Sequence, residues 1–185
     1  MEVQHITLKI FAQEAAGIDL ADAIPVFHRW IQNGVAPELL IDVADYRHVP
    51  AGPGVMLVGF EANYSLDLAE ERLGLLYNRK KADVGSTREK LQQAYEAALA
   101  ACQRLESEPE FRGRLKFDPG ECEVIFNDRL LAPNTEESFR ALRPDLEQFF
   151  AAVWGAGDFD LDWVGEPRER LRVRASARRT APQPV

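Results

Sequence analysis

The sequence predicts an α+β fold in which about three helices pack on one face of an antiparallel sheet. Some segments alternate apolar and polar residues, which is typical of half-buried strands. Between them lie segments whose apolar residues recur every three or four positions, which is typical of amphipathic helices. The predicted order is strand, helix, two strands, helix, two strands, helix, two strands. The first part, residues 1–118, therefore has the ferredoxin-like βαββαβ order, and the βαββ remainder extends or repeats the layer.

Two elements are predicted at the start of the chain. Residues 3–11 are predicted to form a strand, with Ile6, Leu8 and Ile10 on one face and His5, Thr7 and Lys9 on the other. A helix follows in the stretch IPVFHRWIQNG, because Pro25 suits a first helical turn and the pair Asn33-Gly34 suits a left-handed stop. The next stretch, ELLIDVADY, fits either a short strand or a loop.

Residues 55–67 predict a single half-buried strand, because larger apolar residues alternate with glycine or polar residues from Val58 to Asp67. The segment RLGLLYNRKK returns along this strand, and pairing Leu66 with Leu73 keeps the two apolar faces in phase. This register places Glu61 opposite Asn78, on the polar face of the predicted sheet.

The most clearly defined helix begins with a capping box, in which Ser86 and Glu89 open the stretch STREKLQQAYEAALAACQRLESEP. The following stretch, RLKFDPGECEVIF, predicts a hairpin with Pro119-Gly120 at the centre of a type II turn. A third helix is expected to begin at Asn134, which suits the N-cap position.

A last hairpin is predicted in DFDLDWVGEPRERLRVRA, turning about Glu166. Its three aspartates and Glu169 superficially imitate a calcium loop, but Trp163 stands where that loop requires glycine. Strand alternation accounts for them better, as a ladder of opposite charges across the two strands. The predicted pairs are Asp158 with Arg174, Asp160 with Arg172, and Asp162 with Arg170.

The length suits one hydrophobic core, so we expect residues 1–176 to form a single α+β domain and residues 177–185 a loose C-terminal tail. No apolar run reaches about 18 residues, and the N-terminal stretch lacks the pattern of a signal peptide. We therefore expect a cytoplasmic protein without a membrane segment. Cys102 and Cys122 fall within apolar patterns and suit reduced core thiols.

The formal net charge of -8 argues against nucleic-acid binding, which requires cations to neutralise phosphates. From Arg168 onward, however, six arginines accompany a single acidic residue, Glu169, as in an anion-binding tail. The predicted ladder weakens that reading because it pairs three of these arginines. The segment FNDRLLAPNT offers an anion a helix N-terminus, but turn-forming residues explain its composition more simply.

Motifs for cofactor and metal chemistry are missing from the sequence. The stretch GPGVML holds two glycines of a dinucleotide-binding loop, yet it leads into a strand and has no third glycine at the required place. We found no Walker motif, no G-x-S-x-G elbow, no histidines at i and i+4, and no Cys-x-x-Cys pair. We therefore expect no cofactor and no metal.

One surface remains as a candidate site, the sheet face that the helices leave open. An imidazole and a carboxylate on a rigid sheet can perform acid–base work or bind a ligand. The alternatives are a solvated face or the interface of a homodimer. The candidate ligand-binding residues are His5, Thr7, Glu61, Asn63 and Asn78, with His48 at the rim.

The phrases IPVFHRWIQ, LLIDVADYRHVPAGPGV and NDRLLAPNT resemble a family of bacterial proteins with no assigned activity, and the resemblance covers most of the chain. It implies no ligand, cofactor or catalytic residue. Two hypotheses follow from the residues themselves: a non-catalytic cytoplasmic module that binds a small molecule or a protein, and a small-molecule enzyme that uses His5 or His48 with Glu61. A nucleic-acid reader is the weakest alternative, because Phe60 and Tyr64 share the apolar face.

Overall fold

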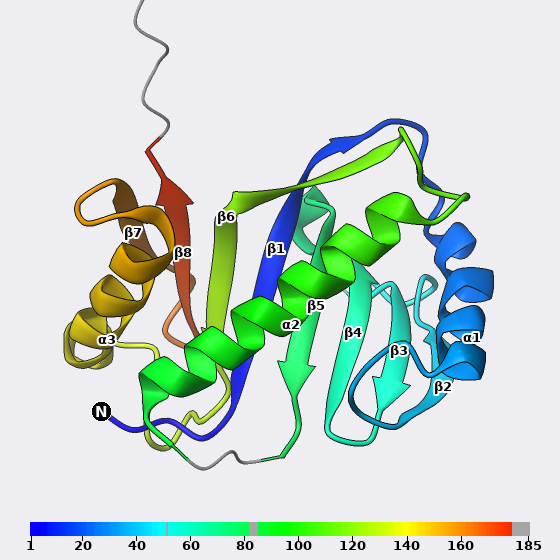
Figure 1. Cartoon of the computed structure of the whole chain (residues 1–185). Coiled ribbons are helices and arrows are strands. Elements are labelled where there is room, and N and C mark those ends of the chain that lie inside the picture. Colours follow the sequence, from blue (N-terminus) through cyan, green and yellow to red (C-terminus); the bar gives the residue numbers. More distant parts are fainter. Residues whose placement is uncertain (51, 82–84, 179–185) are drawn as a thin grey trace, which may run out of the picture.

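The structure is a computed structural model that describes residues 1–50, 52–81 and 85–178. In this part of the chain, eight strands form one antiparallel sheet in the order β2-β3-β4-β5-β1-β6-β8-β7, and three α-helices accompany it (Figure 1). The bounds are β1 Ile6–Ala15, α1 Ala23–Asn33, β2 Leu40–Asp45, β3 Val55–Gly59, β4 Ala62–Asp67, β5 Gly74–Arg79, α2 Thr87–Ser107, β6 Leu115–Phe126, α3 Glu136–Trp154, β7 Phe159–Val164 and β8 Leu171–Ala177. The predicted α+β class with an antiparallel sheet is confirmed.

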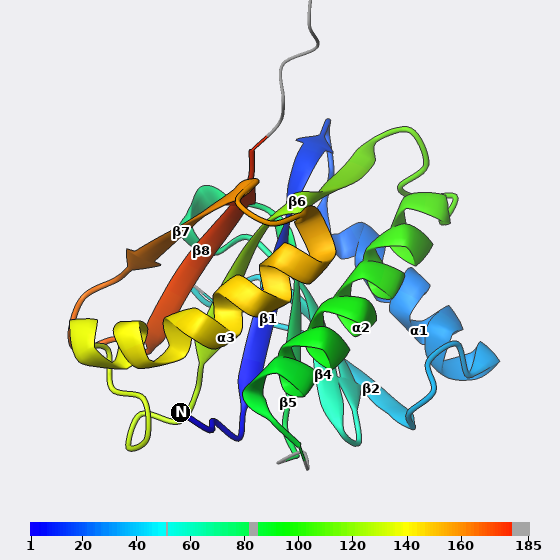
Figure 2. The same cartoon turned by 60° about the vertical axis from the view of Figure 1, so that its left-hand side comes forward.

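The hydrophobic core lies between the sheet and the helices. Helix α2 crosses β1, β5 and β6 diagonally, while α1 packs against β2 and β3 and α3 against β7 and β8 (Figures 1 and 2). Along β1, Leu8 and Ile10 point into this core and are fully buried, as the alternation predicts. Strand pairing places Tyr77 and Val124 beside Leu8, so one apolar layer runs across the centre of the sheet.

The capping box of α2 is confirmed. Ser86 Oγ accepts a hydrogen bond from Glu89 N, and the Glu89 carboxylate accepts one from Ser86 N in return. Helix α1 ends as predicted at Gly34, whose φ of 57° lies in the left-handed region that favours glycine.

The single strand predicted for residues 55–67 is wrong, since the chain turns at residues 60–61 and forms the hairpin β3–β4. The carboxylate of Glu38 holds this turn by accepting hydrogen bonds from Glu61 N and Ala62 N, at 3.1 and 2.8 Å. Gly59 permits the turn, because a Cβ there would lie 2.5 Å from Ala62 O. Four strands therefore separate α1 from α2, and the ferredoxin-like βαββαβ order is not confirmed.

The register between β4 and β5 differs from the prediction by two residues, since Leu66 lies opposite Leu75 and not Leu73. A shift of two positions leaves the paired side chains of β4 and β5 on their predicted faces, because the strand period is two. The same register places Asn63 opposite Asn78.

The hairpin predicted about Pro119-Gly120 is also wrong, because residues 115–126 form one long strand along β1. Between the pairs Ile10–Cys122 and Ala12–Phe117, a single residue of β1 faces residues 118–121 of β6. This segment is a bulge, where a proline without an N–H group is tolerated. Asp118 Oδ1 accepts a hydrogen bond from Gly120 N within it.

The last hairpin forms, but its register differs from the prediction by four residues, since Trp163 lies opposite Val173. The predicted ladder of charges is therefore wrong. Asp160 pairs with Arg178, whereas Arg172 and Arg174 pair with Glu70 and Glu123.

Two further predictions are corrected near α3 and at the C-terminus. The N-cap of α3 is Thr135, and Asn134 instead accepts a hydrogen bond from Trp163 Nε1 at 2.5 Å. Ala177 ends β8 and Arg178 pairs with Asp160, so neither belongs to a loose tail. The rest of the predicted tail, residues 179–185, lies outside the described residues.

Candidate functional site

A cavity of about 350 Å³ lies on the helix-covered side of the sheet, between α1, α2 and strands β3 to β5. Its size falls in the range of small-molecule sites, about 300 to 1,000 Å³. The cavity exists because α2 carries small side chains, Ala97, Ala100 and Ala101, where it faces Tyr64 and Tyr77 of the sheet. We call this space the helix-side cavity.

Tyr64 and Tyr77 form one wall of the helix-side cavity, with ring centroids 5.2 Å apart in an edge contact. Tyr64 Oη donates a hydrogen bond of 2.8 Å to Glu38 Oε1, the carboxylate that also holds the β3–β4 turn. Gln93 Nε2 of α2 donates to Tyr77 Oη at 2.8 Å. Both phenols are therefore held in fixed positions by partners from other elements.

Burial raises the pKa of Tyr64 well above its ordinary value, and the hydrogen bond to Glu38 raises it further. Burial likewise raises the pKa of Tyr77. The two phenols consequently stay neutral at physiological pH and serve as hydrogen-bonding groups.

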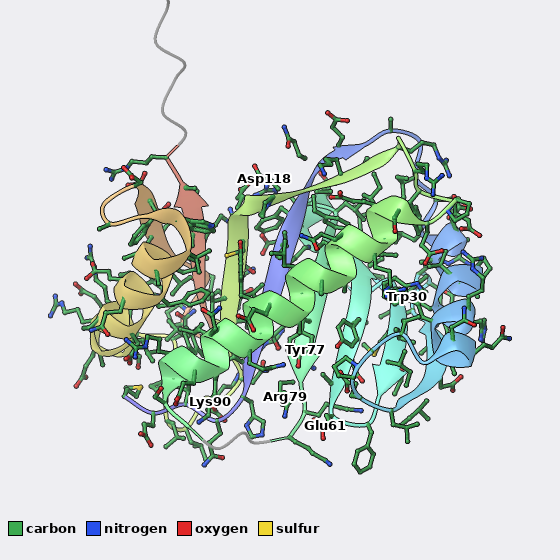
Figure 3. The ribbon with its side chains drawn as sticks, viewed as in Figure 1. Trp30, Glu61, Tyr77, Arg79, Lys90 and Asp118 are labelled. Atoms are coloured by element: carbon green, nitrogen blue, oxygen red, sulfur yellow. The ribbon has the colours of Figure 1, made fainter. Side chains whose placement is uncertain are left out.

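The rim of the helix-side cavity carries charge of both signs. Glu61 Oε2 lies 3.2 Å from Arg79 Nη2, and Figure 3 shows these two residues and Tyr77 around the lower ends of β4 and β5. On the α1 side, the Arg104 guanidinium lies 5.9 Å from the centre of the Trp30 ring. Among the described residues that line the cavity, two carboxylates thus balance two guanidinium groups.

Trp30 is anchored by its polar edge as well as by packing. Its Nε1 donates a hydrogen bond of 2.7 Å to Glu108 Oε1, and the same carboxylate accepts from Arg29 Nη2 at 2.8 Å. The side chain is only 4% exposed, so it forms a rigid apolar wall of the cavity.

The structure brings two of the predicted site residues together on the open face. Thr7 Oγ1 donates to Asn78 Oδ1 at 2.9 Å and accepts from Asn127 Nδ2 at 2.8 Å. Asn63 lies beside them, opposite Asn78, and its Oδ1 is buried without a hydrogen-bond partner in the described part of the chain. The open face therefore does carry a polar cluster, and its organising residue, Asn127, was not among those predicted.

His5 lies at the start of β1 and is paired with Asp128, whose Oδ1 is 2.8 Å from His5 Nδ1. Asp128 Oδ2 accepts hydrogen bonds from the main-chain N–H groups of Gln4 and His5. Burial acts to raise the pKa of Asp128, but the hydrogen bonds from His5 and Gln4 outweigh it, and the pKa is lowered. These contacts fasten the chain before β1 to the loop after β6.

The predicted pairing of a histidine with Glu61 is wrong. Glu61 belongs to the β3–β4 turn and lines the helix-side cavity with Tyr64 and Tyr77, whereas its predicted neighbours Thr7 and Asn78 point to the open face. His48 lies in the exposed turn between β2 and β3, beside the pair formed by Arg47 and Asp45.

The helix-side cavity was missed because its residues come from five separate elements. One signal was available, the alanine-rich stretch AALAA of α2, which lies between the larger buried side chains of Tyr95 and Leu105. Residues with small side chains on the inner face of a helix leave space wherever the opposing strand does not fill it.

Metal-binding clusters and membrane-spanning helices are both absent from residues 1–50, 52–81 and 85–178. No group of three or more His, Cys, Asp or Glu side chains is arranged there to hold a metal ion. None of the helices is long and apolar enough to cross a membrane.

The fold and the cavity define a class, an α+β protein with helices on one face of an antiparallel sheet and a small-molecule-sized cavity beneath them. No protein-family model matches the chain, and no curated protein shows significant similarity to it.

Proposed function

We propose that this protein is a non-catalytic module that binds a small organic molecule in the helix-side cavity. The observation that carries the proposal is the preformed wall of aromatic side chains, Trp30, Tyr64 and Tyr77, each fixed by a hydrogen bond to another element. Apolar and aromatic walls with a few fixed polar groups are the usual composition of ligand sites. The two buried free thiols, Cys102 and Cys122, support a reducing compartment such as the cytoplasm.

The charges at the rim restrict the class of ligand. Because Glu38 and Glu61 balance Arg79 and Arg104, a ligand with a large net charge would leave an uncompensated charge partly buried. The cavity therefore suits a neutral or zwitterionic molecule with a flat apolar body. Phenols with raised pKa values would hydrogen-bond to such a molecule without removing a proton from it.

A thermal-shift panel of neutral and zwitterionic aromatic metabolites tests the proposal. A ligand at about 100 times its dissociation constant adds about 2.7 kcal/mol, which raises the melting temperature by about 5 to 10 °C for a chain of this length. Ala97→Leu fills the cavity without removing any of its polar groups, so it should abolish the shift. Ala141→Leu makes the same change on an exposed position of α3 and should leave the shift intact.

A ligand whose shift survives in Ala97→Leu binds elsewhere and contradicts the proposal. A panel without any shift in the wild-type protein also counts against it.

A further inference from the structure

A second cavity, of about 440 Å³, lies on the open face of the sheet, over the side chains of β1, β5, β6 and β8. We call it the open-face cavity. It is separate from the helix-side cavity, because the sheet itself lies between them. Part of its lining is apolar and consists of Phe11, Leu76 and Ile125, and the rest is strongly charged.

The carboxylates around the open-face cavity are all paired with cations. Among the described residues these carboxylates are Asp67, Glu70, Glu123 and Glu169. Asp67 pairs with Lys9, which also donates a hydrogen bond of 2.7 Å to Arg72 O. Glu70, Glu123 and Glu169 each pair with Arg172. Arg174 also pairs with Glu70 and Glu123.

Three arginines that line this cavity have no acidic partner within 4 Å in the described part of the chain. They are Arg129, in the loop after β6, and Arg168 and Arg170, in the loop before β8. They add three positive charges to the lining of one cavity in a chain whose formal net charge is -8. The sequence-based prediction had instead paired Arg170 with Asp162.

Arg170 is held in position by the polar cluster of the open face. Its Nη1 donates a hydrogen bond of 2.8 Å to Asn127 Oδ1, and Asn127 is fixed in turn by its bond to Thr7. Burial lowers the pKa of Arg170, and the positive charges of Arg129 and Arg172 lower it further. An anion bound between these arginines would relieve their mutual repulsion.

We propose that the open-face cavity binds a small organic anion. Its carboxylate or phosphate group would be held by Arg129, Arg168 and Arg170, and its apolar part would lie against the partly exposed Leu76, next to Ile125. Guanidinium groups suit this role because they stay charged and donate paired hydrogen bonds to oxyanions. This site is independent of the ligand proposed for the helix-side cavity.

Phenyl phosphate and inorganic phosphate are the probes, titrated into the protein by calorimetry at low ionic strength, where such contacts are least screened. Phenyl phosphate should bind more tightly than inorganic phosphate, because only the former reaches the apolar wall. In the double variant Arg129→Gln/Arg168→Gln, the dissociation constant for phenyl phosphate should rise at least about tenfold, the equivalent of about 1.4 kcal/mol. Because neither arginine pairs with a carboxylate, this variant should fold as the wild type does.

The matched control is Arg140→Gln/Arg143→Gln, which removes two exposed arginines of α3 that lie outside the cavity. Its dissociation constant should stay within about twofold of the wild-type value, since distant exposed charges are screened. Ala97→Leu should also leave phenyl phosphate binding unchanged, so failure of the helix-side proposal is distinguishable from failure of this one. Equal losses in the cavity and control variants, or no binding by the wild type, overturn the proposal.

A lipid headgroup presents the same chemistry from a different source. Leu130, next to Arg129, is 100% exposed, as expected of a loop that touches a bilayer. Vesicles containing phosphatidic acid form the third arm of the experiment. If the protein sediments with these vesicles but does not bind soluble phenyl phosphate, the small-anion proposal is overturned in favour of a lipid headgroup.

Discussion

The two faces of the sheet bury different kinds of side chain. Under the helices, burial falls on apolar groups such as Leu8, Ile10 and Tyr77, as expected for a face covered by amphipathic helices. On the open face, Lys9 and Glu123 are each only 4% exposed although none of the three α-helices in the described part of the chain packs on this face. Alternation along a strand thus tells which face a residue is on, but it does not tell whether that face is solvated.

The central part of the open face is buried because long charged side chains lie across it. Arg72 stacks on Phe11 with its guanidinium carbon 3.9 Å from the ring centre, and Arg172 and Arg174 reach back to Glu70 and Glu123. Glu70 has a φ of 58°, an unusual value for a residue other than glycine. Its ion pairs with the two arginines of β8 help to offset that strain.

The largest expected effect comes from the buried ion pair of the open face. Lys9→Ala would leave the carboxylate of Asp67, 5% exposed, without its cation. We expect a loss of about 3 to 5 kcal/mol in the free energy of unfolding, because an unpaired buried charge keeps its full desolvation cost. Urea denaturation followed by circular dichroism measures this loss.

The double variant Lys9→Met/Asp67→Leu is the control for that prediction. Replacing both charges by apolar groups of similar volume should recover most of the lost stability. A loss below about 1 kcal/mol in Lys9→Ala would show that the open face is wetter than its exposures indicate.

Sequence alone predicts the parts of this fold that are determined locally. The capping box of α2 and the left-handed stop of α1 at Gly34 depend on residues within a few positions of each other, and both form as predicted. The turn at residues 60–61 could not be predicted, because it depends on Glu38, more than 20 residues earlier in the chain. No local pattern contains that contact.

The candidate site was predicted only in part for the same reason. Thr7 and Asn78 were placed correctly on one face, because strand alternation is local. Glu61 was misplaced, because the prediction carried alternation through a turn. The arginines of β8 could not be assigned to partners, since their register depends on a turn whose length the sequence left open.

The next prediction concerns the helix-covered face, where Tyr64 carries a buried hydroxyl. Tyr64→Phe would leave Glu38 Oε1 without this donor. We expect a loss of about 1.5 to 3 kcal/mol in the free energy of unfolding at pH 8, the usual range for hydrogen bonds to charged groups. Urea denaturation measures it, and Tyr46→Phe, at an exposed tyrosine, should change stability by less than about 0.5 kcal/mol.

The pH dependence of stability gives a second measurement on the same variant. The pKa of Tyr64 is higher in the folded state than its ordinary value of about 10. The contribution of the neutral Tyr64 hydroxyl to folding stability is therefore fully present below about pH 10 and is lost as the pH rises further. Above pH 10 each such tyrosine reduces stability by up to about 1.4 kcal/mol per pH unit. Tyr64→Phe should therefore show a shallower decline than the wild type, and an unchanged slope would contradict the assignment.

A smaller effect is expected from the polar cluster of the open face. Thr7→Val removes the hydroxyl that bridges Asn78 and Asn127 while conserving the shape of the side chain. The free energy of unfolding should fall by about 1 to 2 kcal/mol, since buried amide groups would lose a partner. Thr7→Ser keeps the hydroxyl and should lose less than half as much. Equal losses in the two variants would indicate that the methyl group contributes as much to stability as the hydrogen bonds do.

The smallest effect is expected in the helix-side cavity, and its sign distinguishes a packing defect from a binding site. Ala97→Leu adds three carbons to a partly apolar space, and each buried CH₂ group is worth up to about 0.8 kcal/mol. Because the cavity opens to solvent and the new side chain loses rotamer freedom, we expect a net gain of only about 0.5 to 1 kcal/mol in the free energy of unfolding.

A gain would mean that a single substitution stabilises the fold by closing this space. An open cavity retained at the expense of stability is typical of functional sites. A loss of more than about 1 kcal/mol would mean that α2 already packs as closely as its neighbours allow, and the case for a ligand there would rest on the binding panel alone.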